Sequence, residues 1–269
     1  MSEILHLNLE LTSQCNQRCV YCFNESGPKS PHSVLNLQTW RQVAEAFCGF
    51  GLQSVHFTGG EPLMKRDISQ FLKEAQRLGL QTSVLSNGFR IPDAIKQDPD
   101  TWSALSVVQI SLDSARSLKH NLRRGLKDAW NDAISAIRAL RRAQIPCEVS
   151  LTLSQENLED LLPLTKFCAR NNLKLIVRAL QPIGRGMASG LKAVPIDKLE
   201  NELDKLRSLY PGILTSDRFM YVPTSPLHDR NAALAGVLTV LPNGRFRGSV
   251  FETKGTRAQI GSVQELLAA

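Results

Sequence analysis

Three cysteines, Cys15, Cys19 and Cys22, lie within eight residues in the segment CNQRCVYC, with the spacing C-x3-C-x2-C. Clustered thiolates suit two kinds of metal site, zinc ions and iron–sulfur clusters. A structural zinc ion takes four protein ligands, usually as two separated pairs, and no second cysteine pair is present here. His6 or His32 could supply a fourth ligand, although neither has the usual paired spacing. A [4Fe–4S] cluster held by three cysteines leaves one iron open to a small molecule, and the spacing favours this reading.

Polar and glycine-rich motifs follow three other short segments that have the character of β-strands. SVHF ends in TGGEP, QTSVLS ends in Asn87-Gly88, and VVQISL ends at Asp113. In parallel α/β folds the carboxyl ends of the strands meet at one edge, which is the edge that carries active sites. We therefore expect the cysteine segment and these three motifs to come together at one edge of a sheet.

The elements that must position these motifs alternate between strand and helix. Strict alternation of apolar and polar residues predicts the first strand directly before the cysteines. Strand and helix patterns then follow each other about six times, which indicates a parallel sheet with covering helices but does not separate an open sheet from a barrel. The expected strands are 4–11, 54–57, 81–86, 107–112, 147–153 and 173–180, and the expected helices are 37–50, 68–79, 128–143 and 158–172.

The character of the chain changes after residue 180. The glycine-rich stretch QPIGRGMASG predicts a turn region, and PIDKLENELDKLRSL predicts a helix at 195–209. The segment 236–251 has the pattern of a hairpin with Asn243-Gly244 at its turn, and SVQELLAA predicts a short final helix. We expect these residues to form a small α+β segment appended to the sheet.

The composition excludes several classes of protein. Of the 269 residues 42% are hydrophobic, which is normal for a soluble protein with a core. No run of about 18 apolar residues predicts a membrane span, and the first residues do not have the pattern of a signal peptide, so we expect a cytoplasmic protein. The net charge of +7 is spread along the chain, which argues against nucleic acid as a partner. In a reducing compartment Cys48, Cys147 and Cys168 are expected to be unpaired core residues.

The motifs CNQRCVYC, TGGEP, SVLSNG, VVQISLD and the pair Arg124-Gly125 resemble, in this order, those of the radical S-adenosylmethionine (SAM) enzymes. The resemblance covers residues 4 to about 185, and it implies a partial (β/α)6 TIM-like barrel at 1–185. Residues 186–269 would then be a degenerate SPASM/twitch-like α+β extension. Related extensions carry auxiliary clusters on cysteines, but Ala233 and Ser249 stand at those places here and no cysteine follows Cys168. The resemblance therefore implies a single [4Fe–4S] cluster.

The resemblance also implies roles for individual residues. Cys15, Cys19 and Cys22 would bind three irons, and the amine and carboxylate of SAM would chelate the fourth. The remaining candidates for binding SAM are Gly59 and Gly60, which allow close approach of the backbone to the methionyl amine, Glu61 near that amine, Pro62 at the turn, Ser86 and Asn87 near the ribose and carboxylate, Ser111 and Asp113 for ribose hydroxyls or substrate, Arg124 against the carboxylate, and Tyr21 and Leu180 against the adenine.

Such a cofactor set implies reductive cleavage of SAM to a 5′-deoxyadenosyl radical, which removes a hydrogen atom from a substrate. The expected substrate is a ribosomally made peptide or a small biosynthetic metabolite, and the expected partner is an electron donor such as flavodoxin or ferredoxin. Without an auxiliary cluster, redox-neutral outcomes such as epimerisation are easier to support than a net oxidation. The alternative is a non-catalytic metal module, either a zinc-stabilised scaffold or an iron–sulfur electron carrier, neither of which needs a SAM pocket.

Overall fold

The structure is a computed structural model that describes residues 6–30, 34–49, 51–216, 237–243 and 246–247. Within these residues nine strands form one sheet in the order β7-β6-β5-β4-β3-β2-β1-β8-β9. Every neighbouring pair is parallel except β8 and β9, which are antiparallel. The strands are β1 (His6–Glu10), β2 (Ser54–Thr58), β3 (Gln81–Ser86), β4 (Val107–Ser111), β5 (Cys147–Leu153), β6 (Lys174–Ala179), β7 (Leu214–Ser216), β8 (Val237–Val240) and β9 (Phe246–Arg247).

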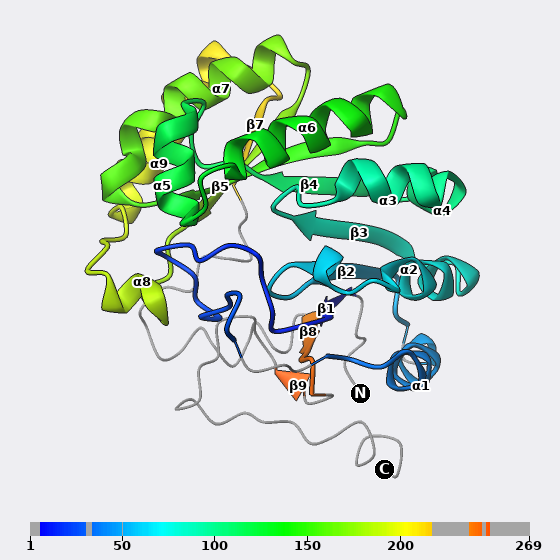
Figure 1. Cartoon of the computed structure of the whole chain (residues 1–269). Coiled ribbons are helices and arrows are strands. Elements are labelled where there is room, and N and C mark those ends of the chain that lie inside the picture. The colour runs from blue at the N-terminus through cyan, green and yellow to red at the C-terminus, as the bar shows by residue number, and fades with distance from the viewer. Residues whose placement is uncertain (1–5, 31–33, 50, 217–236, 244–245, 248–269) are drawn as a thin grey trace.

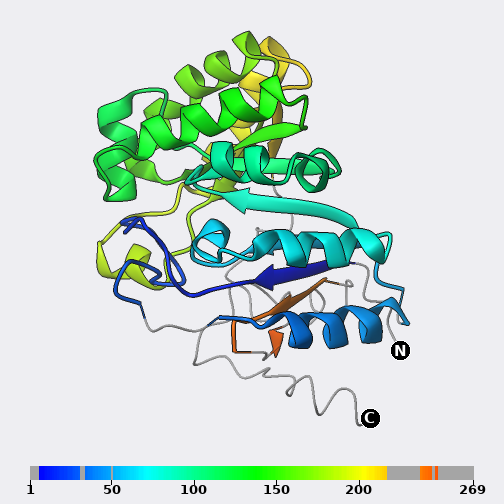
Figure 2. The ribbon, with the colours of Figure 1, turned by 45° about the vertical axis from the view of Figure 1, so that its right-hand side comes forward.

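Helices cover the outer face of this sheet, where α1, α2, the pair of α3 and α4, α6 and α7 follow one another (Figures 1 and 2). The cysteine segment and α8 lie at the carboxyl end of the strands (Figure 1). The helices are α1 (Leu37–Cys48), α2 (Ile68–Arg77), α3 (Ile91–Gln97), α4 (Pro99–Ser103), α5 (Ser117–Arg124), α6 (Ala129–Arg142), α7 (Leu161–Arg170), α8 (Arg185–Ala188) and α9 (Ile196–Leu209), with 3-10 turns η1 (Pro62–Met64) and η2 (Gln155–Asp160).

The two faces of the sheet differ in polarity, and this difference positions the site. Residues such as Leu9, Phe57 and Ile110 are fully buried under the helices, where each buried side chain of this size contributes roughly 1.5–3 kcal/mol. Alternate positions on the other face are polar. His56 Nδ1 lies 2.7 Å from Ser83 Oγ, and Arg178 donates to Gln109 at 2.6 Å. The sheet therefore has an apolar face for the core and a polar face that lines a cavity.

The predicted α/β fold with a partial parallel barrel is confirmed, since β1 to β6 are parallel and adjacent in chain order. The predicted strands agree with the observed bounds to within two residues, because apolar–polar alternation is a strong local signal. Helices α3, α4 and α5 were not expected. The cap residues of all three, Arg90, Asp98 and Arg116, make no side-chain capping hydrogen bond, and α3 and α4 have only seven and five residues, so their periodicity is weak although each has a proline in its first turn.

The described part of the expected extension adds to the same sheet at both ends. β7 pairs with β6, and β8 pairs with β1 in parallel register, with Thr239 and Val240 fully buried. The antiparallel pairing of β8 with β9 agrees with the expected hairpin. Ala233, Ser249, His32 and the expected final helix lie outside the described residues. The division of the chain at residue 185 stays a prediction.

Candidate functional site

The segment between β1 and α1 folds into a closed loop at the carboxyl edge of the sheet, and we call residues 13–27 the cysteine loop. The N–H of Cys15 donates to the carbonyl of Gly27, which closes the loop. Cys15 and Cys19 are buried and Cys22 is half-buried. All three cysteines line one cavity, so the structure brings together the three thiols that the sequence predicts as cluster ligands.

The same cavity is bounded by the carboxyl ends of β2 to β6. Its wall contains predicted residues from six separate segments, and it adds polar residues from β5 and β6 that the sequence did not single out. Pro62 and Asp113 are the predicted residues that do not line it. The lining includes Tyr21, Gly59, Gly60, Glu61, Ser86, Asn87, Ser111, Arg124 and Leu180, together with Ser150, Thr152 and Arg178.

The two glycines after β2 pack against the start of the cysteine loop. The N–H of Gly60 donates to the carbonyl of Thr12 at 2.7 Å, and the N–H of Glu61 donates to that of Gln14 at 2.8 Å. A Cβ atom at Gly60 would lie only 2.1 Å from Gln14 O, so no other residue fits without moving the loop. The structure shows this close approach against the chain that carries Cys15, and the predicted approach of the same backbone to the methionyl amine of SAM stays a prediction.

Glu61 connects the loop after β2 to the end of β3. Its Oε1 accepts hydrogen bonds from Ser86 Oγ at 2.8 Å and from the N–H of Leu63 at 3.1 Å, and its Oε2 accepts from the N–H of Asn87 at 2.8 Å. Burial raises the pKa of Glu61 to about 7, although these donors oppose the shift. The carboxylate also lines the cavity, so it is placed where a cationic ligand would stabilise its charge.

Asn87 bridges β3 to the cysteine loop. Its side-chain Nδ2 donates to Asn16 Oδ1 at 2.8 Å and lies 3.6 Å from Cys15 Sγ. Ser86 is engaged with Glu61, so the two residues that were assigned to ribose and carboxylate contacts also hold the site together. Asn16 was not singled out from the sequence, because nothing in its local pattern shows that a distant amide will reach it.

Asp113 takes a different position from the one expected. It is fully buried, and its carboxylate accepts a hydrogen bond from Tyr21 Oη at 2.5 Å and pairs with the Arg124 guanidinium at 2.9 Å. Burial alone would raise the pKa of Asp113, but Arg124 and Arg123 hold it below the usual range. A ribose or substrate contact would require a free carboxylate oxygen, so Asp113 instead joins the cysteine loop to β4 and α5.

Residues after β6 make a further attachment that the sequence reading missed. Arg185 in α8 donates from Nε to the carbonyl of Cys19 at 2.9 Å and also donates to that of Ser26. Ser189 Oγ donates to the carbonyl of Val20 at 2.9 Å. The sequence predicts only a glycine-rich turn for this stretch, and the arginine between two glycines is the signal that could have indicated a binding role.

The donor set fits an iron–sulfur cluster. N–H groups are directed at two of the sulfurs, from Gln17 to Cys15 at 3.4 Å and from Arg124 to Cys19 at 3.9 Å. Burial raises the pKa of Cys19 to about 11 and that of Cys15 further, so their thiolates require a bound cation. Across the described ranges no three His, Cys, Asp or Glu side chains converge on a single metal ion.

A parallel partial barrel whose carboxyl edge holds three cysteines beside a glycine–glycine–glutamate loop defines the class of protein. The model of the radical SAM superfamily matches residues 9–168, which is more than half of the chain. The chain therefore belongs to the radical SAM superfamily, whose members that match this chain are enzymes.

Its similarity to individual curated proteins is moderate. The chain is 30% identical over 192 residues to the sporulation killing factor maturation protein SkfB of Bacillus subtilis, covering 70% of this chain and 45% of SkfB. It is 29% identical to the PqqA peptide cyclase of Gluconobacter oxydans, covering 57% of this chain and 43% of the cyclase. It is 26% identical to the GTP 3′,8-cyclase of Moorella thermoacetica, covering 78% and 66%. The chain thus spans about half the length of the first and second of these relatives.

Solved structures show the same fold. Streptococcus suis SuiB bound to S-adenosylmethionine superimposes with a TM-score of 0.78 at 15% identity, covering 98% of this chain and 64% of SuiB. The structure of anSMEcpe with AdoMet and a peptide gives a TM-score of 0.71 at 16% identity, covering 97% and 78%. None of the helices in the described part of the chain is long and apolar enough to cross a membrane.

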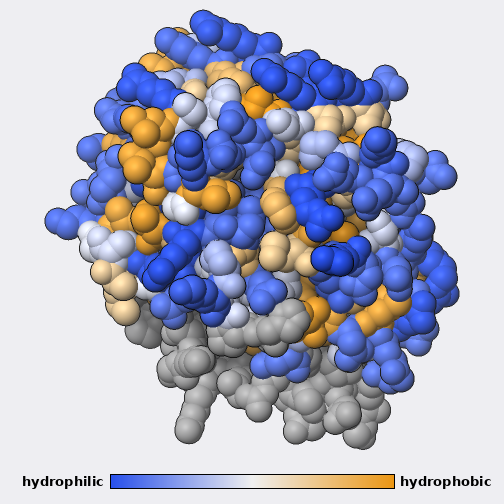
Figure 3. All heavy atoms as spheres, in the orientation of Figure 1, coloured by the Kyte–Doolittle hydropathy of each residue, from blue (hydrophilic) through white to orange (hydrophobic). Residues whose placement is uncertain are grey.

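Exposed apolar side chains lie on the elements that hold the cysteine loop. Leu118 and Leu122, one helical turn apart on α5, are 70% and 66% exposed, and Met187 on α8 is 68% exposed. Figure 3 shows hydrophobic atoms gathered at the left of a mostly hydrophilic face, in the region of α5. The carbonyls of Arg123 and Arg124 in α5 accept from the N–H groups of Val20 and Arg18, so this apolar surface adjoins the cysteine loop.

Proposed function

We propose that this chain cleaves S-adenosylmethionine reductively at a single [4Fe–4S] cluster and uses the resulting radical to remove a hydrogen atom from a substrate. The observation that carries the proposal is the cavity at the carboxyl edge of the sheet. Three cysteines from one loop line it together with residues from the ends of five strands. A metal-stabilised scaffold or a simple electron carrier would not require the second set of residues.

The residues divide into three roles within this proposal. Cys15, Cys19 and Cys22 would hold the cluster, and Glu61 would face the ammonium group of SAM. When bound, the cluster supplies one electron that cleaves SAM to methionine and the 5′-deoxyadenosyl radical. Arg124 lines the cavity as part of its ion pair with Asp113, and it is the candidate partner for the carboxylate of SAM. Polar side chains on β5 and β6 would orient the substrate against the reacting carbon and exclude water.

Peptides are the substrate class that the comparisons support best. One relative is named as a cyclase of the PqqA peptide and another as a maturation protein of a sporulation killing factor, and SuiB has been solved with its precursor peptide SuiA. A small biosynthetic metabolite is the second candidate, because the chain is also similar to GTP 3′,8-cyclases and to an AdoMet-dependent heme synthase. Those activities belong to the relatives, and for this chain we propose a peptide substrate.

An electron donor is required as a partner, and the apolar surface of α5 and α8 is the candidate contact. Leu118, Leu122 and Met187 lie next to the cysteine loop, so a carrier such as flavodoxin or ferredoxin bound there would be near the cluster. Such encounters are weak and need only a small interface. A cytoplasmic location agrees with six unpaired thiols and with a cluster that needs reducing conditions.

The test is anaerobic reconstitution with iron and sulfide, followed by reduction with dithionite in the presence of SAM. We expect about four irons per chain, broad visible absorption that reduction bleaches, and formation of 5′-deoxyadenosine. Deuterated candidate peptides should then transfer deuterium into 5′-deoxyadenosine. A colourless protein with one zinc and no cleavage of SAM would establish the metal scaffold instead.

A further inference from the structure

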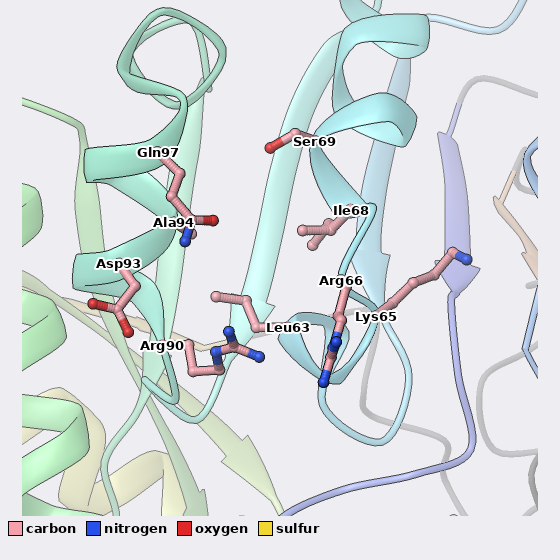
Figure 4. A pocket seen from close by; sticks show the side chains of 9 residues that line it. All are labelled: Leu63, Lys65, Arg66, Ile68, Ser69, Arg90, Asp93, Ala94 and Gln97. Carbon is pink, nitrogen blue, oxygen red and sulfur yellow. The ribbon is translucent and has the colours of Figure 1, made fainter.

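A second cavity lies outside the barrel, between the loops that follow β2 and β3 (Figure 4). It has a volume of about 400 Å³ and is distinct from the cysteine-lined cavity, with which it shares no lining residue. This volume is within the range of small-ligand sites and is much larger than an inorganic ion requires. We call it the α2–α3 pocket. Its lining residues are Leu63, Lys65, Arg66, Ile68, Ser69, Arg90, Asp93, Ala94 and Gln97.

Two guanidinium groups give the α2–α3 pocket its charge. Arg66 and Arg90 extend into it from opposite sides at the same end, whereas Lys65 extends away (Figure 4). Lys65 is already engaged, because its Nζ pairs with Asp67 at 2.9 Å and lies over the ring of Phe71. Among the described residues neither Arg66 nor Arg90 has a carboxylate partner. Asp93 at the same pocket offsets only one of these two charges, so the pocket is complementary to a singly charged anion.

The backbone holds Arg90 in an uncommon conformation. Its φ is +58°, in the left-handed region that non-glycine residues seldom adopt, and it follows Asn87 by three residues. On the other side of the pocket, Leu63 is bound through its N–H to Glu61. The α2–α3 pocket is therefore built on the same two loops that contribute Glu61 and Asn87 to the cysteine-lined cavity.

From this geometry we propose that the α2–α3 pocket binds an acidic side chain of the peptide substrate, at a distance from the reacting residue. This inference rests on the proposed peptide substrate. A carboxylate would bind between Arg66 and Arg90, which offer planar pairs of donors. Leu63 and Ile68 line the same pocket but are each only 4% exposed, so the arginine side chains supply most of the contact, and the phosphate competitor in the test separates a peptide carboxylate from free phosphate. Binding here would hold the peptide against the loops that position the cofactor.

The test uses the cluster-reconstituted full chain and a fluorescently labelled peptide of sequence Gly-Glu-Leu-Glu-Gly, followed by anisotropy at low salt. The glutamine version of this peptide, acetate and inorganic phosphate serve as competitors. The variants are Arg66→Gln and Arg90→Asn, since asparagine tolerates the left-handed backbone. The matched control is Lys96→Gln, which removes a positive charge from α3 at a position outside the pocket lining.

We expect the acidic peptide to bind, and each arginine variant to weaken binding about tenfold or more while the Lys96 variant does not, because a hydrogen-bonded charge pair is lost. The glutamine peptide should compete poorly. The inference is overturned if the arginine variants bind as well as the Lys96 variant, if no binding is seen at peptide concentrations of about 1 mM, or if phosphate displaces the peptide more effectively than the unlabelled peptide does.

The same preparations are assayed for 5′-deoxyadenosine without substrate, which separates this inference from the proposed function. Cleavage of SAM with no arginine-dependent peptide binding would reject the pocket and leave the proposed function standing. Arginine-dependent binding without cleavage of SAM would reject the proposed function and leave the peptide site.

Discussion

Arg124 and Asp113 form an ion pair beneath the cysteine loop, with 2.9 Å between Nε and Oδ2, and both residues are buried. Tyr21 Oη donates to the same carboxylate at 2.5 Å. One carboxylate therefore joins the cysteine loop, the end of β4 and the end of α5. A buried charge that loses its partner is strongly destabilising, so the stability of the loop that would hold the cluster depends on this pair.

Replacing Asp113 with Asn should leave the buried Arg124 guanidinium without an opposite charge. We expect the free energy of unfolding to fall by about 3–5 kcal/mol and the iron content to fall with it. Urea unfolding and iron analysis of the anaerobic protein measure both. Tyr21→Phe is the matched control, because it removes one hydrogen bond to the same carboxylate and should cost only about 1 kcal/mol. Equal losses in the two variants would show that the ion pair does not dominate.

The three cysteines of the loop should be the ligands of the cluster. Cys15→Ala, Cys19→Ala and Cys22→Ala are each expected to lose cluster binding and SAM cleavage, because each removes the ligand of one iron. Cys48→Ala, Cys147→Ala and Cys168→Ala should keep about four irons per chain, since none of these thiols lines the cavity. Iron and sulfide analysis with visible spectroscopy is the measurement.

Two results of this cysteine series would contradict the prediction. Loss of iron in Cys168→Ala, beyond the loss of folded protein that a change in the core causes, would mean that the ligand set is misassigned. About eight irons per chain in the wild type would reveal an auxiliary cluster, contrary to the proposal of a single one.

Gly60→Ala should disrupt the cluster as well as the binding of SAM. The added Cβ would lie 2.1 Å from Gln14 O, so the start of the cysteine loop must move. Gly27→Ala is the control, because it changes a glycine of the same loop whose added Cβ would be 3.7 Å from the nearest atom. Electron paramagnetic resonance of the reduced protein, with and without SAM, reports both properties. If Gly60→Ala keeps a full cluster and loses only the response to SAM, then the glycine serves the cofactor directly, as the sequence alone had suggested.

His56 should make the stability of the protein depend on pH below neutrality. Burial, together with the charge of Arg178, lowers the pKa of His56 to about 3, whereas an unfolded histidine titrates near 6.5. The unfolded chain therefore takes up the proton first as the pH falls. The stability that comes from the neutral ring is complete above about pH 6.5 and is lost progressively toward pH 3.

The measurement for His56 is urea unfolding at several pH values, for the wild type and for His56→Gln. The free energy of unfolding of the wild type should fall more steeply between about pH 6.5 and 4 than that of the variant. Other buried groups, including His120, are present in both proteins, so their contribution cancels in the difference. Parallel curves would mean that the pKa of His56 is the same in the folded and unfolded protein, as for a solvated ring.

The sequence by itself determined the framework of this protein and the candidate ligands of its cluster. Alternation in β1 to β6 is a local property, because neighbouring residues point to opposite faces of a strand, and this pattern can be read without knowing the fold. The spacing of Cys15, Cys19 and Cys22 is also local, since one loop contains all three. Parallel strands bring their carboxyl ends to one edge, so the motifs after β2, β3 and β4 could be expected there.

Only the tertiary structure decided which atoms pair within that edge. Asp113 and Tyr21 are separated by 92 positions, and Arg185 reaches Cys19 across 166 positions, so no local pattern connects them. The role of Gly60 depends on a backbone that lies 46 residues earlier in the chain, at Gln14. Arg66 and Arg90 line the same pocket only because the fold brings together the loops that precede α2 and α3. The type and spacing of side chains specify what chemistry is available, whereas packing specifies which of these groups are already engaged by each other and which are left for a ligand.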